Sequence, residues 1–277
     1  MSEPLSAGLY LVATPIGNLG DITLRALAVL ARADVIYCED TRHSLTLTAH
    51  YGITTHLKPY HEYNGARERP KILEALANQR VVALISDAGT PLISDPGYKL
   101  VREVIKAGHK VESLPGASAA LTALTVSGLP TDAFHFVGFL PVRCAARRTR
   151  ISELKGVGST LVLFEAPGRV AEALADLAAV LGPRQAAVAR ELTKRFETVE
   201  RGTLGELAER FAAAGNVKGE IVVLVGPPVE VDVSDEAIAG AVSAAMETMS
   251  LRDAARAVAD EMGVPKSRVY DIGVKLK

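Results

Sequence analysis

Residues 81–97 read VVALISDAGTPLISDPG, an apolar run that passes into a loop rich in glycine, proline and aspartate. Residues 81–86 have the length and β-branched composition of a buried strand. Two glycines, two prolines and two aspartates then fall within residues 86–97, which we call the signature loop. Ligands of α/β sheets bind at the carboxyl ends of the strands. The signature loop is therefore expected to border a ligand site.

The two aspartates of the signature loop receive different interpretations. Asp87 could accept hydrogen bonds from a ribose or an amine, and we assign it to ligand binding. Ser94-Asp95-Pro96 is typical of an Asx turn that leads into a capped helix. We assign Asp95 to that structural role.

Strand and helix patterns alternate on both sides of the signature loop. Strands are expected at residues 9–13, 35–37 and 110–114, and helical spacing follows a predicted N-cap at Asp21. Another helix is expected at residues 97–107. This alternation predicts an α/β fold.

The second half of the chain predicts another α/β domain. Strands are expected at residues 134–139, 160–165, 186–191, 197–201 and 220–225, with helices beginning near Gly168 and Leu204. The third and fourth of these strands are close enough in sequence for a hairpin, which predicts a mixed sheet.

We place an N-terminal α/β domain at residues 1–128, a C-terminal α/β domain at 129–230 and a helical tail at 231–277. Ser250 is expected to cap a helix at 251–262, and a turn at Gly263 leads to a last helix. This pair is compatible with a helix-turn-helix or with a simple helical appendage.

Composition excludes several classes of protein. The 277 residues contain two cysteines and no tryptophan, and the formal net charge is −1. We therefore expect no metal site and no disulfide, and only a local RNA contact. No apolar run approaches the roughly 20 residues of a membrane helix, and the N-terminus has no signal-peptide pattern, so we expect a cytoplasmic protein without membrane contact.

Three glycine-bearing turns follow predicted strands: residues 15–18, the signature loop and residues 115–118. None of them matches GxGxxG, and the chain lacks GxxxxGK[ST]. Together they predict one pocket for a nucleotide-like ligand that no standard phosphate loop holds.

Ionisable side chains follow other strands at the same predicted edge. Glu39 and Asp40 could act as bases, or Asp40 could cap the next helix with Arg42 as its partner. His61 could be a base or an RNA contact, or simply a solvated loop residue. In the second half, Glu165 and Glu191 could line a cleft or cap helices.

Residues 143–150 contain four arginines and no acid, between the end of a strand and a helix expected to begin near Arg147. We predict that this stretch is an exposed basic loop. These side chains could pair with RNA phosphates or form a solvated charged surface. Together with one further arginine they are the predicted RNA-binding residues: Arg42, Arg143, Arg147, Arg148 and Arg150.

The signature loop closely resembles that of the tetrapyrrole methylase superfamily, in the branch that methylates ribosomal RNA. Further motifs match in order: LYLVATPIGNLGDIT, CEDTRH, LPGASAALTAL, GLPTDAFHFVGFLP, FEAPGR, ARELTK and KGE. The resemblance covers residues 9–225, and the tail also resembles that of the family. Gly168 departs from the pattern, which has histidine there, so any role of that side chain is lost.

The resemblance implies two α/β domains of tetrapyrrole-methylase type with S-adenosylmethionine in the cleft between them, typically in a homodimer. It implies 2'-O-methylation of a cytidine in 16S ribosomal RNA of the small ribosomal subunit, expected to be cytidine 1402. Carried over by position, the cofactor-binding residues are Pro15, Gly17, Asp87, Ala88, Gly89, Pro115, Gly116, Ser118, Ala119, Phe164, Glu165 and Leu192.

The superfamily also includes enzymes that methylate tetrapyrrole ring carbons. The CEDTRH motif, the arginine-rich stretch and the tail argue against such a substrate. A non-catalytic ribosome-assembly factor that retained the fold is the remaining alternative. For the methyltransferase, Asp40, Glu39 and His61 are the candidate bases toward a ribose hydroxyl.

Overall fold

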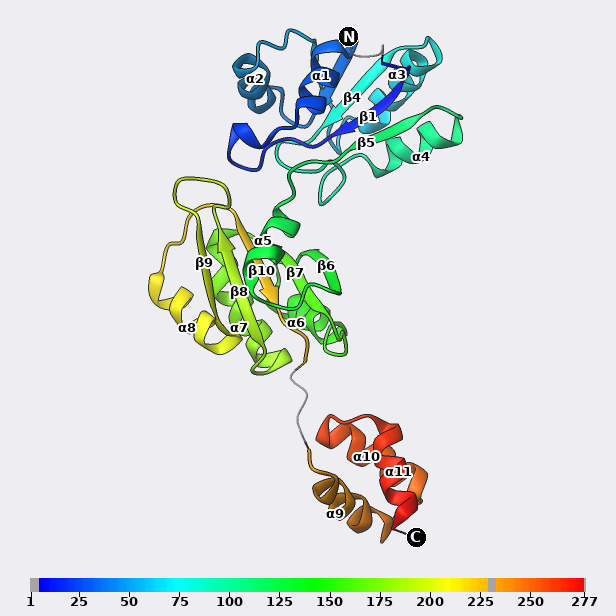
Figure 1. The fold of residues 1–277 in the computed structure, drawn as a ribbon, viewed down its shortest axis with the longest axis vertical. Coiled ribbons are helices and arrows are strands. Elements are labelled where there is room, and N and C mark those ends of the chain that lie inside the picture. Colours follow the sequence, from blue (N-terminus) through cyan, green and yellow to red (C-terminus); the bar gives the residue numbers. More distant parts are fainter. Residues whose placement is uncertain (1–4, 229–232, 277) are drawn as a thin grey trace. The chain divides into compact units, whose positions relative to one another are not determined.

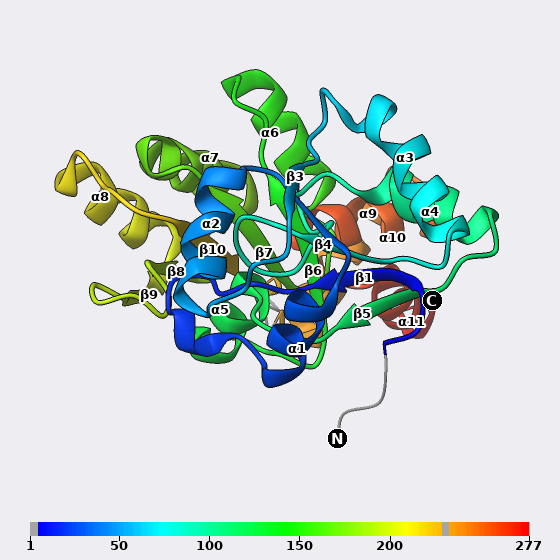
Figure 2. The same cartoon turned by 90° about the horizontal axis from the view of Figure 1, so that it is seen from above.

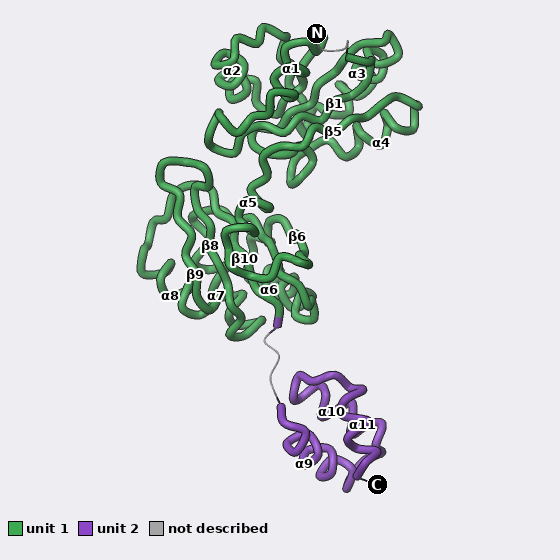
Figure 3. Tube along the Cα trace, viewed as in Figure 1, with its two compact units in different colours: residues 1–227 green, residues 228–277 purple. Residues whose placement is uncertain are grey.

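The computed structural model describes residues 5–228 and 233–276. The chain divides into two compact units, residues 1–227 and 228–277 (Figure 3). The larger unit contains two five-stranded sheets. None of the helices in the described ranges is long and apolar enough to cross a membrane.

The first sheet is parallel, with strand order β3-β2-β4-β1-β5 (Figure 1). Its strands are β1 (Gly8–Val12), β2 (Val35–Cys38), β3 (Leu57–Pro59), β4 (Val81–Ile85) and β5 (Val111–Leu114). The loops that leave all five strands therefore gather at one edge of the sheet, as the α/β prediction requires.

Helices cover both faces of the first sheet: η1 (Leu19–Asp21), α1 (Leu24–Arg32), α2 (Thr41–His50), α3 (Gly65–Ala77) and α4 (Tyr98–Lys106). Helix α1 packs on one face, while α3 and α4 lie side by side on the other (Figure 2). The predicted helix start at Asp21 is wrong. Asp21 ends a 3-10 turn, and Thr23 caps α1 by accepting a hydrogen bond from the Ala26 amide.

The second sheet is mixed, with strand order β6-β7-β10-β8-β9. Its strands are β6 (Phe134–Phe139), β7 (Thr160–Glu165), β8 (Gln185–Arg190), β9 (Thr198–Thr203) and β10 (Ile221–Val225). Strands β6 and β7 are parallel, and the other pairs are antiparallel. The antiparallel β8–β9 pair confirms the predicted hairpin.

Helices also cover both faces of the second sheet: α5 (Ala119–Ser127), α6 (Cys144–Glu153), η2 (Pro167–Arg169), α7 (Val170–Leu181) and α8 (Leu204–Ala214). Ala123 and Leu124 of α5 pack against Val162, Val222 and Leu224 of this sheet. A division at residue 128 thus leaves in the first domain a helix that packs on the second sheet. The division itself stays a prediction.

The predicted basic loop at residues 143–150 is wrong, because residues 144–153 form α6. Arg147 lies on the buried face of this helix with 2% of its side chain exposed. Its guanidinium lies 2.7 Å from buried Asp176 and 3.3 Å from Glu172. The helix predicted to begin near Arg147 begins at Cys144 instead. Arg147 is buried and paired with Asp176, which gives it a structural role and does not fit an RNA contact.

The smaller unit contains α9 (Asp235–Met246), α10 (Leu251–Met262) and α11 (Lys266–Lys275). Ser250 caps α10 as predicted, accepting from the Asp253 amide, and Gly263 ends it with a φ of 66°. Helix α9 lies within the predicted helical tail, but its bounds were not predicted. Its Ile238 and Val242 complete a core with α10 and α11.

Candidate active site

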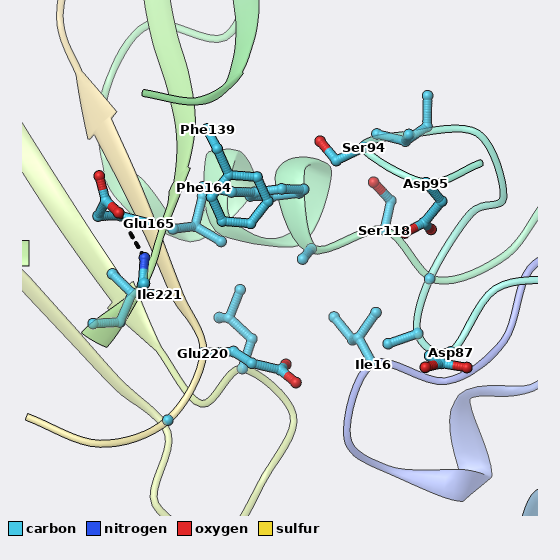
Figure 4. A pocket seen from close by; sticks show the side chains of 18 of the residues that line it. Ile16, Asp87, Ser94, Asp95, Ser118, Phe139, Phe164, Glu165, Glu220 and Ile221 are labelled. Carbon is cyan, nitrogen blue, oxygen red and sulfur yellow. Dashed lines mark hydrogen bonds between the residues drawn. The ribbon is translucent and has the colours of Figure 1, made fainter. Parts of the chain in front are cut away.

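A cavity of about 460 Å³ lies between the loops of the first sheet and one end of the second sheet (Figure 4). Eight of the twelve predicted cofactor-binding residues line it: Asp87, Ala88, Gly89, Ser118, Ala119, Phe164, Glu165 and Leu192. Pro15 and Gly17 line an adjoining cavity of about 310 Å³, which shares Ile16, Asp87, Ala88 and Glu220 with the first. Pro115 and Gly116 line neither cavity.

Hydrogen bonds hold the three glycine-bearing turns together. Thr14 and Gly89 exchange two backbone hydrogen bonds of 2.9 and 3.0 Å, which join the loop after β1 to the signature loop. The Thr90 hydroxyl donates to the Ala117 carbonyl at 3.1 Å, which adds the turn after β5. The three turns thus border one site, as their positions after parallel strands predict.

Two of the predicted cofactor-binding glycines allow close packing. A Cβ at Gly116 would lie 2.7 Å from the Ala13 Cβ, and a Cβ at Gly17 would collide with the Lys194 side chain. These glycines therefore let the turns approach their neighbours. Gly168 differs, because a Cβ there would meet nothing within 4 Å.

The signature loop has a strained backbone. Leu92 and Ser94 adopt φ angles of 73° and 66°, in the left-handed region that costs non-glycine residues roughly 1 kcal/mol or more each. The N-cap of α4 is Gly97, which makes no side-chain cap bond. Asp95 therefore does not cap α4, and the Asx turn assigned to it stays a prediction. Asp95 lines the cavity, on the same side as Ser94 and Ser118 (Figure 4).

Acidic groups from two strand ends surround Asp95. Burial, followed by repulsion from Glu39, raises the pKa of Asp95 to about 6, against a hydrogen bond from Ser86. Burial and repulsion from Asp87 also raise the pKa of Glu39, while His61 opposes the shift. Asp87 is anchored differently, since its Oδ1 accepts from the Asp40 amide at 3.1 Å. The position of Asp95 in the cavity is not predictable from its Ser-Asp-Pro context, because this context is typical of a turn.

Asp40 is the N-cap of α2. Its carboxylate accepts from the Arg42 amide at 2.8 Å and pairs with the Arg42 guanidinium at 2.7 Å. The hydrogen bonds from Arg42 lower the pKa of Asp40 to about 2. A carboxylate with so low a pKa is a weak base. The structure thus favours the capping interpretation of Asp40 over the catalytic one.

Asp40→Asn is expected to keep turnover within about threefold of the original, because asparagine caps helices as well as aspartate does. Rates of methyl transfer and affinity for S-adenosylhomocysteine would be measured for both proteins. A large loss of turnover with unchanged affinity would instead make Asp40 the base.

His61 and Glu39 remain candidates. The half-buried His61 ring has a buried Nδ1 without a hydrogen-bond partner among the described residues. Its backbone amide donates to Asn64 Oδ1 at 2.9 Å, which fixes the loop after β3. Glu39 is exposed and does not line the cavity.

The second sheet supplies an apolar wall. The rings of Phe164 and Phe139 meet edge to face with centroids 5.7 Å apart, and Ile221 lies on the same side of the cavity (Figure 4). Leu192 also lines the cavity. Buried Glu165 also lines this wall, where it pairs with Arg169 at 2.5 Å. An apolar slot with a few fixed polar groups is typical of a small-molecule site.

The loop before β10 also belongs to the site. Gly219 and Glu220 of the KGE motif line the cavity. Glu191 does not line it. Its Oε1 instead accepts from Lys194 Nζ and from the Glu220 amide, each at 2.9 Å, and so holds this loop in place. Among the described residues no group of three or more His, Cys, Asp or Glu side chains has a metal-site arrangement.

Two α/β sheets with a ligand-sized cavity at the carboxyl edge of the parallel one define the tetrapyrrole methylase class. Residues 8–208 match the family model described as Tetrapyrrole (Corrin/Porphyrin) Methylases, and residues 232–277 match the model described as RsmI C-terminal HTH domain. The uroporphyrin-III C-methyltransferase of Thermus thermophilus, solved in complex with S-adenosylhomocysteine, superposes with a TM-score of 0.55 at 23% identity. That match covers 81% of this chain and 99% of the other.

Curated relatives narrow the class. The chain is 57% identical to the ribosomal RNA small subunit methyltransferase I of Mesorhizobium japonicum, over 82% of this chain and 77% of the relative. It is 45% identical to the protein of that name from Micromonospora olivasterospora, over 97% and 87%. The chain belongs to the ribosomal RNA small subunit methyltransferase I family.

Proposed function

We propose that this chain uses S-adenosylmethionine to methylate the 2'-hydroxyl of a cytidine in 16S ribosomal RNA of the small subunit. The observation that carries the proposal is the cavity of about 460 Å³, closed by an apolar wall on one side and by fixed loops on the other. The family name of the curated relatives supports the RNA substrate. Cytidine 1402 is the expected position.

The residues of the cavity fit S-adenosylmethionine. Phe164 and Leu192 offer apolar contact to an adenine, while Asp87 and the strained signature loop offer acceptors for a ribose or an amine. When bound, the cofactor supplies an electrophilic methyl group on a sulfonium. The protein aligns the two reactants and excludes water from the reacting atoms.

The arginines predicted to contact RNA differ in whether they are already in ion pairs. Arg42 and Arg150 are paired with Asp40 and Glu153, each at 2.7 Å, and Arg148 is paired with Asp176 at 2.6 Å. Arg143 is exposed and has no ion pair among the described residues. We propose that Arg143 contacts an RNA phosphate directly. Arg42, Arg148 and Arg150 would contact phosphates only by exchanging their present carboxylate partners for them.

Arg143→Ala is expected to weaken binding to small subunits and to lower the slope of log affinity against log salt by roughly one, because about one phosphate contact is lost. Lys106→Ala, at the end of α4, is the control, because it also removes one positive charge. Its slope of log affinity against log salt should equal that of the original protein. Filter binding at several salt concentrations measures both. Identical slopes for the two variants would assign Arg143 to the solvated surface.

Homodimer formation and a cytoplasmic location complete the proposal. Both agree with the family resemblance, and the ribosomal substrate is itself cytoplasmic. Size-exclusion chromatography with light scattering would measure the oligomeric state directly.

Transfer of labelled methyl groups to different acceptors tests the function. The protein is incubated with methyl-labelled S-adenosylmethionine and either small subunits that lack the modification or a tetrapyrrole. We expect label in the RNA alone. Label in the tetrapyrrole alone would contradict the proposal, and label in neither acceptor would favour a non-catalytic assembly factor.

A further inference from the structure

The carboxyl group of Asp95 lies at one end of the cavity, where Ser86 donates a hydrogen bond to it. It lines the cavity beside Ser94 and Ser118 (Figure 4), and Gly97 rather than Asp95 caps the following helix. Leu92 and Ser94, in the same loop as Asp95, adopt left-handed backbone angles. Strain of this kind persists at sites where it serves function.

We propose that Asp95 is the catalytic base that accepts the proton of the ribose 2'-hydroxyl, an inference that rests on the proposed function. The hydroxyl oxygen forms the new bond to the methyl carbon while its O–H bond breaks, and the proton passes to the Asp95 carboxylate. The electron pair of the broken carbon–sulfur bond stays on sulfur, so the products are the 2'-O-methyl ribose and S-adenosylhomocysteine. The carboxyl then releases its proton to water.

The other carboxylates near the cavity are less suited to this role. Asp87 accepts a hydrogen bond from the Asp40 amide, and Asp40 is engaged by Arg42. Glu165 and Glu220 are paired with Arg169 and Lys194, the latter at 3.3 Å. Asp87 and Asp95 both face acidic neighbours instead of a cation among the described residues. They differ in their hydrogen bonds, because Asp87 is held by a backbone amide whereas Asp95 accepts from the Ser86 hydroxyl.

The charged surroundings of Asp95 come from two strand ends. Glu39 follows β2 and Asp87 follows β4, and both repel negative charge on Asp95. His61, after β3, acts on Glu39 with the opposite sign. Burial, followed by these repulsions, raises the pKa of Asp95 to about 6. The group is thus mostly ionised at neutral pH yet more basic than an ordinary carboxylate, as general-base catalysis favours.

The test compares Asp95→Asn with the original protein and with Asp132→Asn, which changes an exposed loop aspartate. We expect Asp95→Asn to lower kcat by about 100-fold or more. Calorimetric affinity for S-adenosylhomocysteine should stay within about threefold, a change of roughly 0.65 kcal/mol. Asp132→Asn should behave as the original protein in both measurements.

The pH dependence separates a base from a merely structural residue. The rate should fall as the pH drops through about 6, because protonated Asp95 cannot accept a proton. Glu39→Gln removes a repelling charge, so it should move the midpoint of this fall to lower pH, whatever its effect on the maximal rate. NMR of protein labelled with ¹³C at the aspartate carboxyls should show the same midpoint without substrate, and Asp95→Asn should remove that resonance.

Three outcomes would overturn the role of Asp95. An active Asp95→Asn variant would remove it from the mechanism. Equal losses of turnover and of S-adenosylhomocysteine affinity would make Asp95 a cofactor-binding residue. A pH–rate profile of Glu39→Gln that matches that of the original protein would show that the titrating group is not Asp95. An original protein that methylates no RNA would overturn the proposed function itself, so the two failures are distinguishable.

Discussion

Replacing Ala88 with tryptophan is expected to abolish binding of S-adenosylmethionine while the protein stays folded. Ala88 is exposed and lines both adjoining cavities, so an indole there fills space that the ligand needs. We expect affinity to fall by about 100-fold or more, equivalent to roughly 2.7 kcal/mol. Isothermal titration calorimetry with S-adenosylhomocysteine measures the loss.

Ala213→Trp provides the matched control. Ala213 is an exposed alanine on α8 that lines neither cavity, so the same substitution there should leave affinity unchanged. Both variants should unfold at the temperature of the original protein within a few degrees, because neither alanine is buried. Full affinity in Ala88→Trp would place the cofactor somewhere other than this cavity.

Asp176→Asn is expected to destabilise the larger unit by about 3 to 5 kcal/mol, because Arg147 would stay buried without its closest counter-charge. Burial alone would raise the pKa of Asp176, but hydrogen bonds from Arg148 and Arg147 outweigh it and lower the pKa. The carboxylate therefore stabilises the fold above its ordinary pKa, and this stabilisation is lost as the pH falls through the lowered value. Urea unfolding at neutral and acidic pH measures both effects.

An exposed ion pair on the same helix is the control for this prediction. Arg150 and Glu153 lie 2.7 Å apart, with 42% and 57% of their side chains exposed. Glu153→Gln should cost less than about 1 kcal/mol, because solvent screens such pairs. Arg147→Met combined with Asp176→Leu should recover much of the loss. Equal costs for Asp176→Asn and Glu153→Gln would show that burial adds nothing to the Arg147–Asp176 pair.

The fold is largely predictable from the sequence because its strands are short apolar runs bounded by glycine and proline. The runs at β4 and β10 have no competing interpretation, and the spacing of β8 and β9 indicates their hairpin. The start of α1 is less predictable, because both Asp21 and Thr23 are residue types that cap helices well. Asp21 belongs to the 3-10 turn Leu19–Asp21, and Thr23 is therefore the N-cap. Only tertiary packing shows that α5 belongs to the second sheet.

The parts of the site that are formed by backbone turns are predictable from the sequence. The roles of individual side chains are less predictable, because they depend on burial and on neighbours that are distant in sequence. The three glycine-bearing turns meet because parallel strands end at one edge. No local sequence pattern predicts the buried ion pair of Arg147 or the raised pKa of Asp95. A buried ion pair joins residues 29 positions apart, and the raised pKa of Asp95 arises from burial and from Glu39, which follows a different strand.

The proposed activity is the transfer of a methyl group from the cavity to one ribose of 16S ribosomal RNA. The most direct measurement maps the label on small subunits methylated in vitro, by nuclease digestion and mass spectrometry of the fragments. We predict a single 2'-O-methylcytidine, absent when the Ala88→Trp variant is used. Label on a base, or spread over several nucleotides, would contradict the account.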